Sequence, residues 1–157
     1  MHISIIVPLY NEGKIIKSNI KKIYNFFEKR YTFEIIVIDD CSQDDTLAIL
    51  KSINLKNLKI FSNNTNMGKG YSIIKGMTKS SGDIILTTDA DLSANIYEFE
   101  KLMSCYKKGY SIVIGSRSKK NSKINIRQSI FRIFLGKIFN LLVRVILGLA
   151  YNDTQCG

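Results

Sequence analysis

Short apolar runs rich in β-branched residues alternate with segments of helical periodicity, and this alternation restricts the fold of the chain more than any other feature. The predicted strands cover residues 3–7, 33–38, 58–61, 84–86 and 110–114, and the predicted helices cover residues 14–29, 42–52, 68–79 and 96–107. Chains in which strands and helices alternate form a mainly parallel sheet with helices on its faces. The sequence therefore predicts an α/β domain with a Rossmann-like sheet over residues 1–121.

Three local signals set the expected ends of these elements. Pro8 is expected to stop the first strand, because proline has no N–H to donate to a neighbouring strand. Residues 42–45 (Ser-Gln-Asp-Asp) have the form of a capping box, so they are expected to open the second helix. Gly68-Lys69-Gly70 is expected to begin the third helix.

Polar side chains follow the predicted strands at their carboxyl ends, which is where parallel sheets bind ligands. They are Tyr10 and Glu12 after the first strand, Asp39 and Asp40 after the second, Asp89 and Asp91 after the fourth, and Arg117 after the fifth. The apolar run 84–86 is expected to be buried, and it leads to two carboxylates one residue apart. Hard divalent cations prefer carboxylate and phosphate oxygens, so Asp89 and Asp91 predict a cation site.

The cysteine and histidine content excludes several classes of site. The three cysteines are far apart and lack a C-x-x-C pair, which argues against a disulfide scaffold or a zinc site and favours a reducing compartment. His2 is the single histidine, so a histidine-dependent triad is not expected. No charged segment precedes a long apolar one at the start of the chain, so we expect neither a signal peptide nor an N-terminal anchor.

The net charge of +10 is concentrated in the last third of the chain. Residues 101–152 contain eleven Lys or Arg and no Asp or Glu, which suits nucleic acid, an anionic membrane or a phosphorylated ligand. Within this region, residues 129–149 place polar or small residues at steps of three to four among Ile, Leu, Val and Phe. We expect residues 122–157 to form a basic segment with amphipathic helices in a membrane interface, and an ordinary helix packed on the domain is the alternative.

Two common phosphate-binding motifs and one acidic pocket can be set aside. The first strand is not followed by G-x-G-x-x-G, and Gly68-Lys69-Gly70 lacks the upstream Gly and the Ser or Thr of a P-loop. The pair Asp39-Asp40 suggests the acidic pocket of a receiver domain, but there the acids should follow the first strand. The chemistry must therefore come from another arrangement.

Five segments resemble the motifs of family 2 glycosyltransferases with a GT-A fold, in that family's order and spacing over residues 3–117. They are Val7-Pro8-Leu9-Tyr10-Asn11-Glu12, Val37-Ile38-Asp39-Asp40-Cys41-Ser42-Gln43-Asp44, Asn66-Met67-Gly68-Lys69-Gly70, Asp89-Ala90-Asp91 and Gly115-Ser116-Arg117. The stretch Asp153-Thr154-Gln155-Cys156-Gly157 resembles the polyprenyl (dolichyl) phosphate sugar synthases within this family, and more closely the members that transfer glucose.

The resemblance implies a nucleotide-sugar pocket at the carboxyl ends of the strands. Its residues would be Pro8, Tyr10, Glu12, Asp39, Asp89, Ala90 and Arg117. In this arrangement Tyr10 lies near the base, and the Asp39 carboxylate accepts a hydrogen bond from a ring N–H of the base. Asp89 contacts the ribose, and Arg117 binds a phosphate oxygen.

The resemblance also implies a metal and a second phosphate site. Asp89 and Asp91 would bind Mg²⁺ or Mn²⁺, and Asp91 and Arg117 would be the catalytic residues. Arg127 and Arg132 would hold the acceptor phosphate. Mannosyl-type relatives usually have Gln where this chain has Ser93, so the resemblance does not carry direct metal ligation to that residue.

The implied function is inverting, metal-dependent transfer of a hexose from UDP-glucose or GDP-mannose to a polyprenyl or dolichyl phosphate. An ionised phosphate acceptor needs positioning and charge screening more than a general base. The implied location is peripheral, on the cytoplasmic side of the membrane, with a further membrane anchor possible in a C-terminal part that the chain lacks. The alternatives are a family 2 enzyme acting on a cell-surface glycan and a basic nucleic-acid-binding module. Few aromatic residues alternate with the basic ones, which disfavours nucleic acid as a partner.

Overall fold

The computed structural model describes residues 1–115 together with Phe139, Ile146 and Gly148. These residues divide into two compact units, one formed by Met1–Phe99 and one that begins at Glu100. The elements in chain order are β1 (His2–Leu9), α1 (Gly13–Glu28), β2 (Thr32–Asp39), α2 (Thr46–Lys51), β3 (Leu58–Ser62), α3 (Lys69–Lys79), β4 (Ile84–Thr87), the 3₁₀ helix η1 (Ile96–Glu98) and α4 (Phe99–Tyr106).

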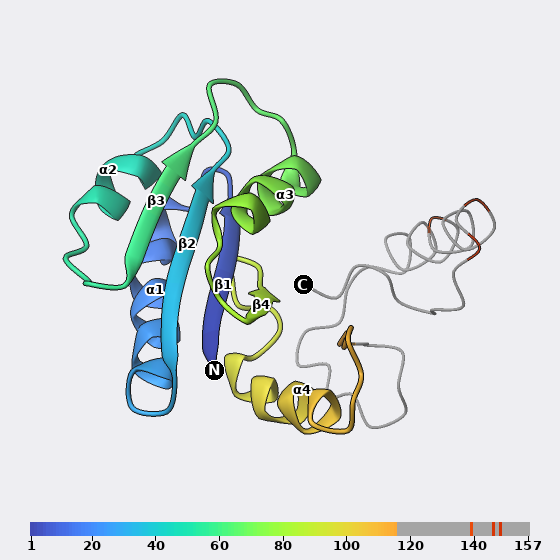
Figure 1. The fold of residues 1–157 in the computed structure, drawn as a ribbon. Coiled ribbons are helices and arrows are strands. Elements are labelled where there is room, and N and C mark those ends of the chain that lie inside the picture. Colours follow the sequence, from blue (N-terminus) through green and yellow to red (C-terminus); the bar gives the residue numbers. More distant parts are fainter. Residues whose placement is uncertain (116–138, 140–145, 147, 149–157) are drawn as a thin grey trace, which may run out of the picture. The chain divides into compact units, whose positions relative to one another are not determined.

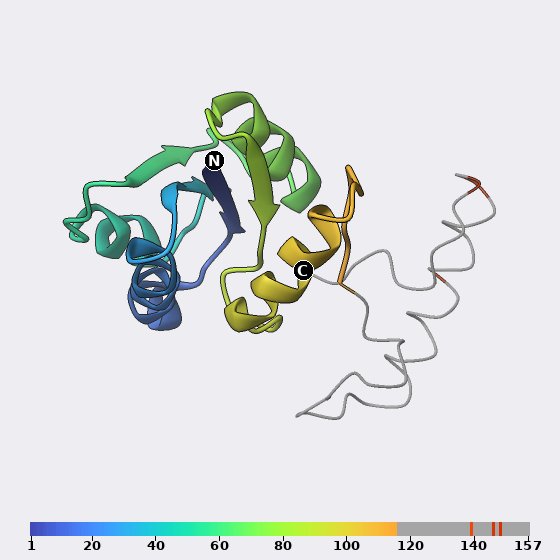
Figure 2. The ribbon, with the colours of Figure 1, turned by 60° about the horizontal axis from the view of Figure 1, so that its bottom comes forward.

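The first unit is a parallel sheet with helices on both faces, as the alternating sequence pattern predicted. The strand order is β3-β2-β1-β4, and all three neighbouring pairs are parallel. Helices α1 and α2 lie on one face of the sheet and α3 lies on the other (Figures 1 and 2). Because the strands are parallel, the loops after β1, β2 and β4 meet at one edge of the sheet.

The central strands β1 and β2 form the core. Every residue of β1 after His2 and every residue of β2 after Thr32 is buried, as expected for parallel strands covered on both faces. The apolar side of α1 completes this layer with Ile16, Ile20, Ile23, Phe26 and Phe27. Ile16, Ile20, Ile23 and Phe27 recur at helical spacing in the sequence, and their burial agrees with the predicted helix.

Pro8 does not stop β1, in contrast to the prediction. The strand continues through Pro8 to Leu9 and stays in register with β2. In a parallel sheet, successive residues bond to opposite neighbours, and the Ile6 carbonyl accepts from Thr88 N on the β4 side. The missing N–H of Pro8 therefore faces the β4 side, where pairing with β1 reaches only Ile6, whereas the pairing with β2 continues to Leu9.

Strand β4 is half-buried, and the prediction of a fully buried strand was wrong. Its residues alternate between half-buried and exposed, and Ile85 is among the exposed ones. The reason is its position, because β4 pairs with β1 and no other described strand pairs with its outer edge. Successive side chains point to opposite faces of the sheet, so the alternation also means that one face of β4 is less covered than the other.

Helix α3 approaches the sheet through small residues. Ser72 and Gly76 are its buried positions, and a Cβ added to Gly76 would collide with the side chain of Ile6. Glycine at this position therefore sets how closely α3 packs on β1.

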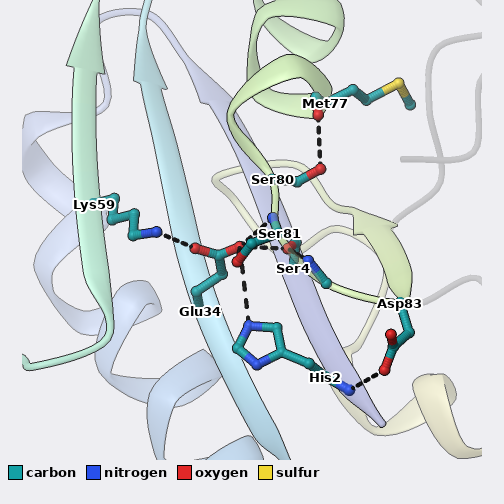
Figure 3. A network of polar contacts seen from close by, with 9 residues as sticks. His2, Ser4, Glu34, Lys59, Met77, Ser80, Ser81 and Asp83 are labelled. Atoms are coloured by element: carbon teal, nitrogen blue, oxygen red, sulfur yellow. Dashed lines mark hydrogen bonds and ion pairs between the residues drawn. The ribbon is translucent and has the colours of Figure 1, made fainter.

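A buried carboxylate ties the amino ends of the strands to the loop before β4 (Figure 3). Glu34 Oε1 accepts hydrogen bonds from Ser4 Oγ at 2.6 Å and from Ser81 N and Oγ at 2.8 and 2.9 Å. Its other oxygen lies 2.6 Å from Lys59 Nζ, and Gly82 N donates to Ser4 Oγ. The network joins β1, β2, β3 and the start of β4.

The predicted capping box is not formed, because its serine has a distant partner. Ser42 Oγ accepts a hydrogen bond from Asn11 N, 31 residues away in sequence. Helix α2 begins only at Thr46, where the Asp44 carboxylate accepts from the Thr46 N–H, and Asp45 makes no side-chain cap bond. The helix is consequently shorter than predicted.

The predicted strand 110–114 is also absent. Residues 110–115 have no regular structure, and Tyr110, Ile112 and Ile114 are exposed. An extended segment needs a neighbouring strand for its backbone hydrogen bonds, and this one pairs with no described strand. Among the residues that the structure describes, no helix is long and apolar enough to cross a membrane. The amphipathic segment predicted within residues 122–157 lies almost entirely outside the described residues.

Candidate active site

An open cavity of about 260 Å³ lies at the carboxyl edge of the sheet. Its lining residues are Pro8, Leu9, Tyr10, Glu12, Asp40, Lys69, Ser72, Asp89, Ala90 and Asp91. Four of these side chains are carboxyl groups and one is an ammonium group, so acids dominate the wall. The end of β1, the loops after β1, β2 and β4, and helix α3 all contribute to it, as expected for the ligand site of a parallel sheet.

The turn that follows β4 carries two of the acids and is held at its centre. The Ala90 carbonyl, between Asp89 and Asp91, accepts a 2.9 Å hydrogen bond from Asn19 Nδ2, a buried side chain of α1. Ser93 N and Oγ donate to the two oxygens of Asp91 at 2.9 and 2.6 Å. The backbone position of the turn is therefore fixed from α1, and Ser93 orients the Asp91 carboxylate.

Lys69 pairs with one of these acids. Its Nζ lies 2.5 Å from Asp89 Oδ1, and both side chains are partly exposed. Lys69 begins α3, so this ion pair joins the start of that helix to the acidic turn after β4. It also places a positive charge beside the site where a cation or a phosphate would bind.

The carboxyl group of Glu12 experiences the other acids of the site. Its pKa is raised from the ordinary value of 4.5, first because the group is partly desolvated and then because Asp91, Asp44 and Asp89 repel its charge. The carboxyl groups of the loop after β1 and of the acidic turn after β4 are therefore close enough to repel one another. A cation bound in the cavity would relieve that repulsion.

Asp40 organises the loop that leads into α3. Its carboxylate accepts from Asn63 Nδ2 at 2.7 Å, from Met67 N at 2.8 Å and from Gly68 N at 2.7 Å. Burial by itself raises the pKa of Asp40, but the bonds from Asn63, Met67 and Gly68 outweigh it and lower the pKa below the ordinary value. Asp40 is therefore a fixed anion that holds Lys69 at the cavity through its neighbour Gly68.

The loops after β1 and β2 are bonded to each other. Besides the Asn11 N to Ser42 Oγ bond, Gln43 N donates to Asn11 Oδ1 at 2.8 Å, and Gly13 N donates to Asp44 Oδ2 at 3.2 Å. Among the described residues, the three non-glycine residues with positive φ all lie in the loops after β1, β2 and β4. They are Asn11, Cys41 and Leu92, with φ of 56°, 64° and 52°. Left-handed backbone is unfavourable for Cys and Leu, so these loops are held in shape by the structure around them.

The structure brings most of the predicted site residues together. Pro8, Tyr10, Glu12, Asp89, Ala90 and Asp91 all line the cavity. Asp39 does not, because its side chain is only 1 % exposed and its Oδ1 lies 3.3 Å from Ser42 N. Arg117, Arg127 and Arg132 lie outside the described residues. The roles assigned to all these residues stay predictions.

Sequence reasoning missed four residues of the site: Asn19, Asp40 as an organising group, Lys69 and Ser72. Asn19 carried a usable signal, since it is the polar residue on the otherwise apolar face of α1. Lys69 stands in one of the five family-like segments, but nothing in the sequence indicated its pairing with Asp89, twenty positions further along the chain.

The donor set of the cavity fits a hard divalent cation that is shared with a ligand. In the described part of the chain, no group of three or more His, Cys, Asp or Glu side chains could hold a metal ion by itself. Asp89 and Asp91 nevertheless offer carboxylate oxygens to the cavity. Mg²⁺ and similar ions are commonly bound by one or two carboxylates plus water and phosphate oxygens. A cation here would complete its coordination in this way.

Comparison with known proteins identifies the family. The family model for glycosyl transferase family 2 matches residues 4–150, which is most of the chain. The chain belongs to glycosyl transferase family 2. The observed parallel sheet with its cavity at the carboxyl edge is accordingly the GT-A fold that the sequence motifs indicated.

Two curated relatives act on polyprenyl phosphates according to their names. A dolichyl-phosphate beta-glucosyltransferase of Trichomonas vaginalis is 32 % identical over 170 residues, covering 100 % of this chain and 50 % of the relative. An undecaprenyl-phosphate 4-deoxy-4-formamido-L-arabinose transferase of Pseudomonas syringae is 31 % identical over 158 residues, covering 98 % of this chain and 45 % of the relative. The chain thus spans about half the length of the curated relatives it matches.

A solved structure similar to this chain contains a nucleotide sugar and a metal ion. The mannosyltransferase PcManGT from Pyrobaculum calidifontis, in complex with GDP-Man and Mn²⁺, matches with a TM-score of 0.51 and 27 % identity. The match covers 57 % of this chain and 27 % of that one.

Proposed function

We propose that this chain is the nucleotide-sugar-binding part of a glycosyltransferase that moves a hexose to a polyprenyl or dolichyl phosphate. The observation that carries the proposal is the acid-lined cavity at the carboxyl edge of the sheet, in a chain similar along its whole length to polyprenyl-phosphate sugar transferases. The two relatives named above differ in their sugar but share the class of acceptor. That shared acceptor is the part of their function most readily transferred to this chain.

The charges of the cavity support a donor that arrives with a cation. Glu12, Asp40, Asp89 and Asp91 would repel the diphosphate of a nucleotide sugar, and Lys69 is the one basic group among the lining residues. Mg²⁺ or Mn²⁺ held by Asp89 and Asp91 would neutralise the diphosphate and supply Lewis acidity at the leaving group. The solved neighbour with GDP-Man and Mn²⁺ supports this donor and this class of metal.

The described residues then position the donor. Pro8 and Tyr10 offer an apolar and aromatic wall for the nucleoside, and Tyr10 is exposed enough to stack on a base. Lys69 leaves Asp89 to contact a phosphate oxygen when the diphosphate is bound. Asn19 and Ser93 keep the acidic turn and the Asp91 carboxylate in place during transfer.

A phosphate acceptor fits a cavity that has no histidine in its wall. His2 is the first residue of β1 and lies at the opposite edge of the sheet from the cavity. It therefore cannot act as a general base in the cavity. A lipid phosphate is already ionised at neutral pH and attacks without losing a proton. Binding at the cytoplasmic surface of a membrane, and a phosphate site formed by Arg117, Arg127 and Arg132, complete the proposal.

The test combines donor binding with lipid labelling. Thermal denaturation of the 157-residue chain is measured with UDP-glucose and with GDP-mannose, each with and without Mn²⁺. We expect one donor to raise the melting temperature only when Mn²⁺ is present. Labelled donor is then incubated with dolichyl phosphate or with dolichol, and label is expected in the lipid fraction only with dolichyl phosphate. Label in a glycan and not in the lipid would contradict the acceptor class.

A further inference from the structure

Helix α3 turns its large apolar side chains away from the sheet. The buried positions of the helix are Ser72 and Gly76, whereas Tyr71, Ile74 and Met77 are 47 %, 62 % and 43 % exposed. A helix that packs on a sheet normally does the reverse, with the apolar stripe inward and the polar residues outward. The arrangement needs an explanation outside the core of the first unit.

The inward side of α3 needs no apolar side chain from this stripe. Gly76 sits against Ile6 so closely that a Cβ would not fit, and Ser72 Oγ accepts from Asn63 Nδ2 at 3.1 Å. Packing on the sheet is thus complete without Tyr71, Ile74 and Met77. Three large apolar side chains on one helix face are a contiguous patch of the kind that marks an interaction surface.

The surroundings of this patch are basic. Two lysines, Lys75 and Lys79, lie on α3 beside the patch. Lys75 Nζ donates to Ser62 O at 2.8 Å, and Lys79 Nζ lies 5.8 Å from the centre of the Phe61 ring. Neither is paired with an acid in the described residues, so the flank of the patch keeps its positive charge. We call Tyr71, Ile74, Met77, Lys75 and Lys79 the α3 outer face.

We propose that the α3 outer face lies in the headgroup region of an anionic lipid bilayer. An apolar stripe flanked by lysines is the design of a helix that lies in a membrane interface, and each lysine near an anionic leaflet adds attraction. Lys75 and Lys79, which pair with no acid in the described part of the chain, give this face charge complementarity to such a leaflet. A water-facing helix would gain nothing from exposing Ile74.

The position of α3 links this surface to the cavity. Lys69 and Ser72, from the first turn of the helix, line the cavity, and the outer face begins at the adjacent Tyr71. A bilayer against α3 would therefore lie beside the donor site, where a polyprenyl phosphate acceptor would be presented. In this respect the inference rests on the proposed function.

The opposite layer of the sheet provides a matched control. The outward side of α1 carries exposed Lys14, Lys17 and Lys21 and the exposed polar residue Asn25, with no exposed large apolar side chain. Such a face is expected to remain in water. Asn25 and Ile74 are both exposed and lie on helices on opposite faces of the sheet (Figure 2).

The experiment uses the full chain with its three cysteines replaced by Ser. A single new cysteine is then introduced, either Ile74→Cys or Asn25→Cys, and is labelled with a polarity-sensitive fluorophore. Vesicles of phosphatidylcholine with phosphatidylserine are added, and vesicles of phosphatidylcholine alone serve for comparison. We expect the label at position 74 to shift to shorter wavelength with the anionic vesicles and the label at position 25 to show no shift. In co-sedimentation, Ile74→Glu is expected to weaken partition about tenfold, and Asn25→Glu, with the same change of charge, less than about threefold.

Two results would overturn the proposal. One is the absence of a spectral shift at position 74 in vesicles that do bind the protein, since binding would then use another surface. The other is a shift at position 74 that grows with protein concentration without vesicles, together with dimers in sedimentation velocity, which would assign the face to a second copy of the chain. Donor binding by thermal shift is measured on the same variants. If a variant still binds the donor while one of these two results is obtained, the α3 proposal has failed and the proposed function has not.

Discussion

Replacing Glu34 by Gln is expected to cost most of the stability that the buried network at the amino edge of the sheet provides. The Glu34 side chain is only 5 % exposed, and it is bonded to Ser4, Ser81 and Lys59 (Figure 3). Burial alone would raise the pKa of this carboxyl group, but the bonds from Lys59, Ser4 and Ser81 outweigh burial and lower the pKa from 4.5 to about 2. The ionised form is thus strongly favoured in the folded chain.

The size of the effect follows from the difference between folded and unfolded pKa values. A shift from 4.5 to about 2 corresponds to about 3 kcal/mol of folding free energy when the group is ionised in both states. Because the folded pKa is the lower one, this stability is present above about pH 4.5 and is lost as the pH falls toward 2. About 2 kcal/mol of it should be gone at pH 3. Glu34→Gln keeps the shape but removes the charge, so its stability should lack this pH-dependent part.

Urea unfolding followed by far-UV circular dichroism at pH 7 and pH 3 measures the difference. At pH 7, Glu34→Gln should be less stable than the parent by about 2 to 3 kcal/mol. The gap should shrink by about 2 kcal/mol at pH 3. Glu28→Gln is the control, since Glu28 is exposed at the end of α1 and its replacement should change little. A gap of the same size at both pH values would refute the assignment of this stability to the Glu34 charge.

Three further outcomes are expected. Asp91→Ala should abolish transfer with the melting temperature almost unchanged, because Asp91 is exposed; activity that survives with added Mn²⁺ would contradict its metal role. Gly82→Ala should lower the free energy of unfolding by about 2 kcal/mol in urea, because a Cβ there would lie 2.6 Å from a backbone nitrogen of β1. Gly70→Ala, which has open space around it, should not lower it. In calorimetry, Lys69→Met should bind Mn²⁺ alone more tightly than the parent chain, because the ammonium group no longer competes for Asp89. It should bind the nucleotide sugar more weakly. Equal Mn²⁺ affinities of the variant and the parent would disprove that competition.

Features that depend on neighbours in sequence were predictable. The buried side of α1 follows from apolar residues at helical spacing, and β1 and β2 follow from continuous β-branched runs. The placement of Tyr10, Glu12, Asp89 and Asp91 at one cavity follows from a topological rule, because parallel strands bring their carboxyl ends to one edge.

Features that depend on a partner distant in sequence could not be predicted. Ser42 looked like a helix cap, but its partner Asn11 lies in another loop. Residues 110–114 form a short apolar run rich in β-branched residues, typical of a strand, but they pair with no described strand and stay irregular. Asp40 and Asp39 are equivalent in the sequence pattern, and only the folded loop places Asp40 at the cavity and buries Asp39. For Ser42 and Asp40, the deciding hydrogen bonds join residues more than twenty positions apart.

The hydrogen bonds between the loops after β1 and β2 have a consequence for the entropy of ligand binding. Asn11, Ser42 and Gln43 lock the two loops together before any ligand arrives. The wall that carries Tyr10 and Glu12 has therefore already lost its conformational freedom on folding, and a nucleotide that binds there loses little more. Asn11 does not line the cavity. The substitution Asn11→Ala should therefore weaken donor binding through this entropy and leave the contacts of the bound complex unchanged.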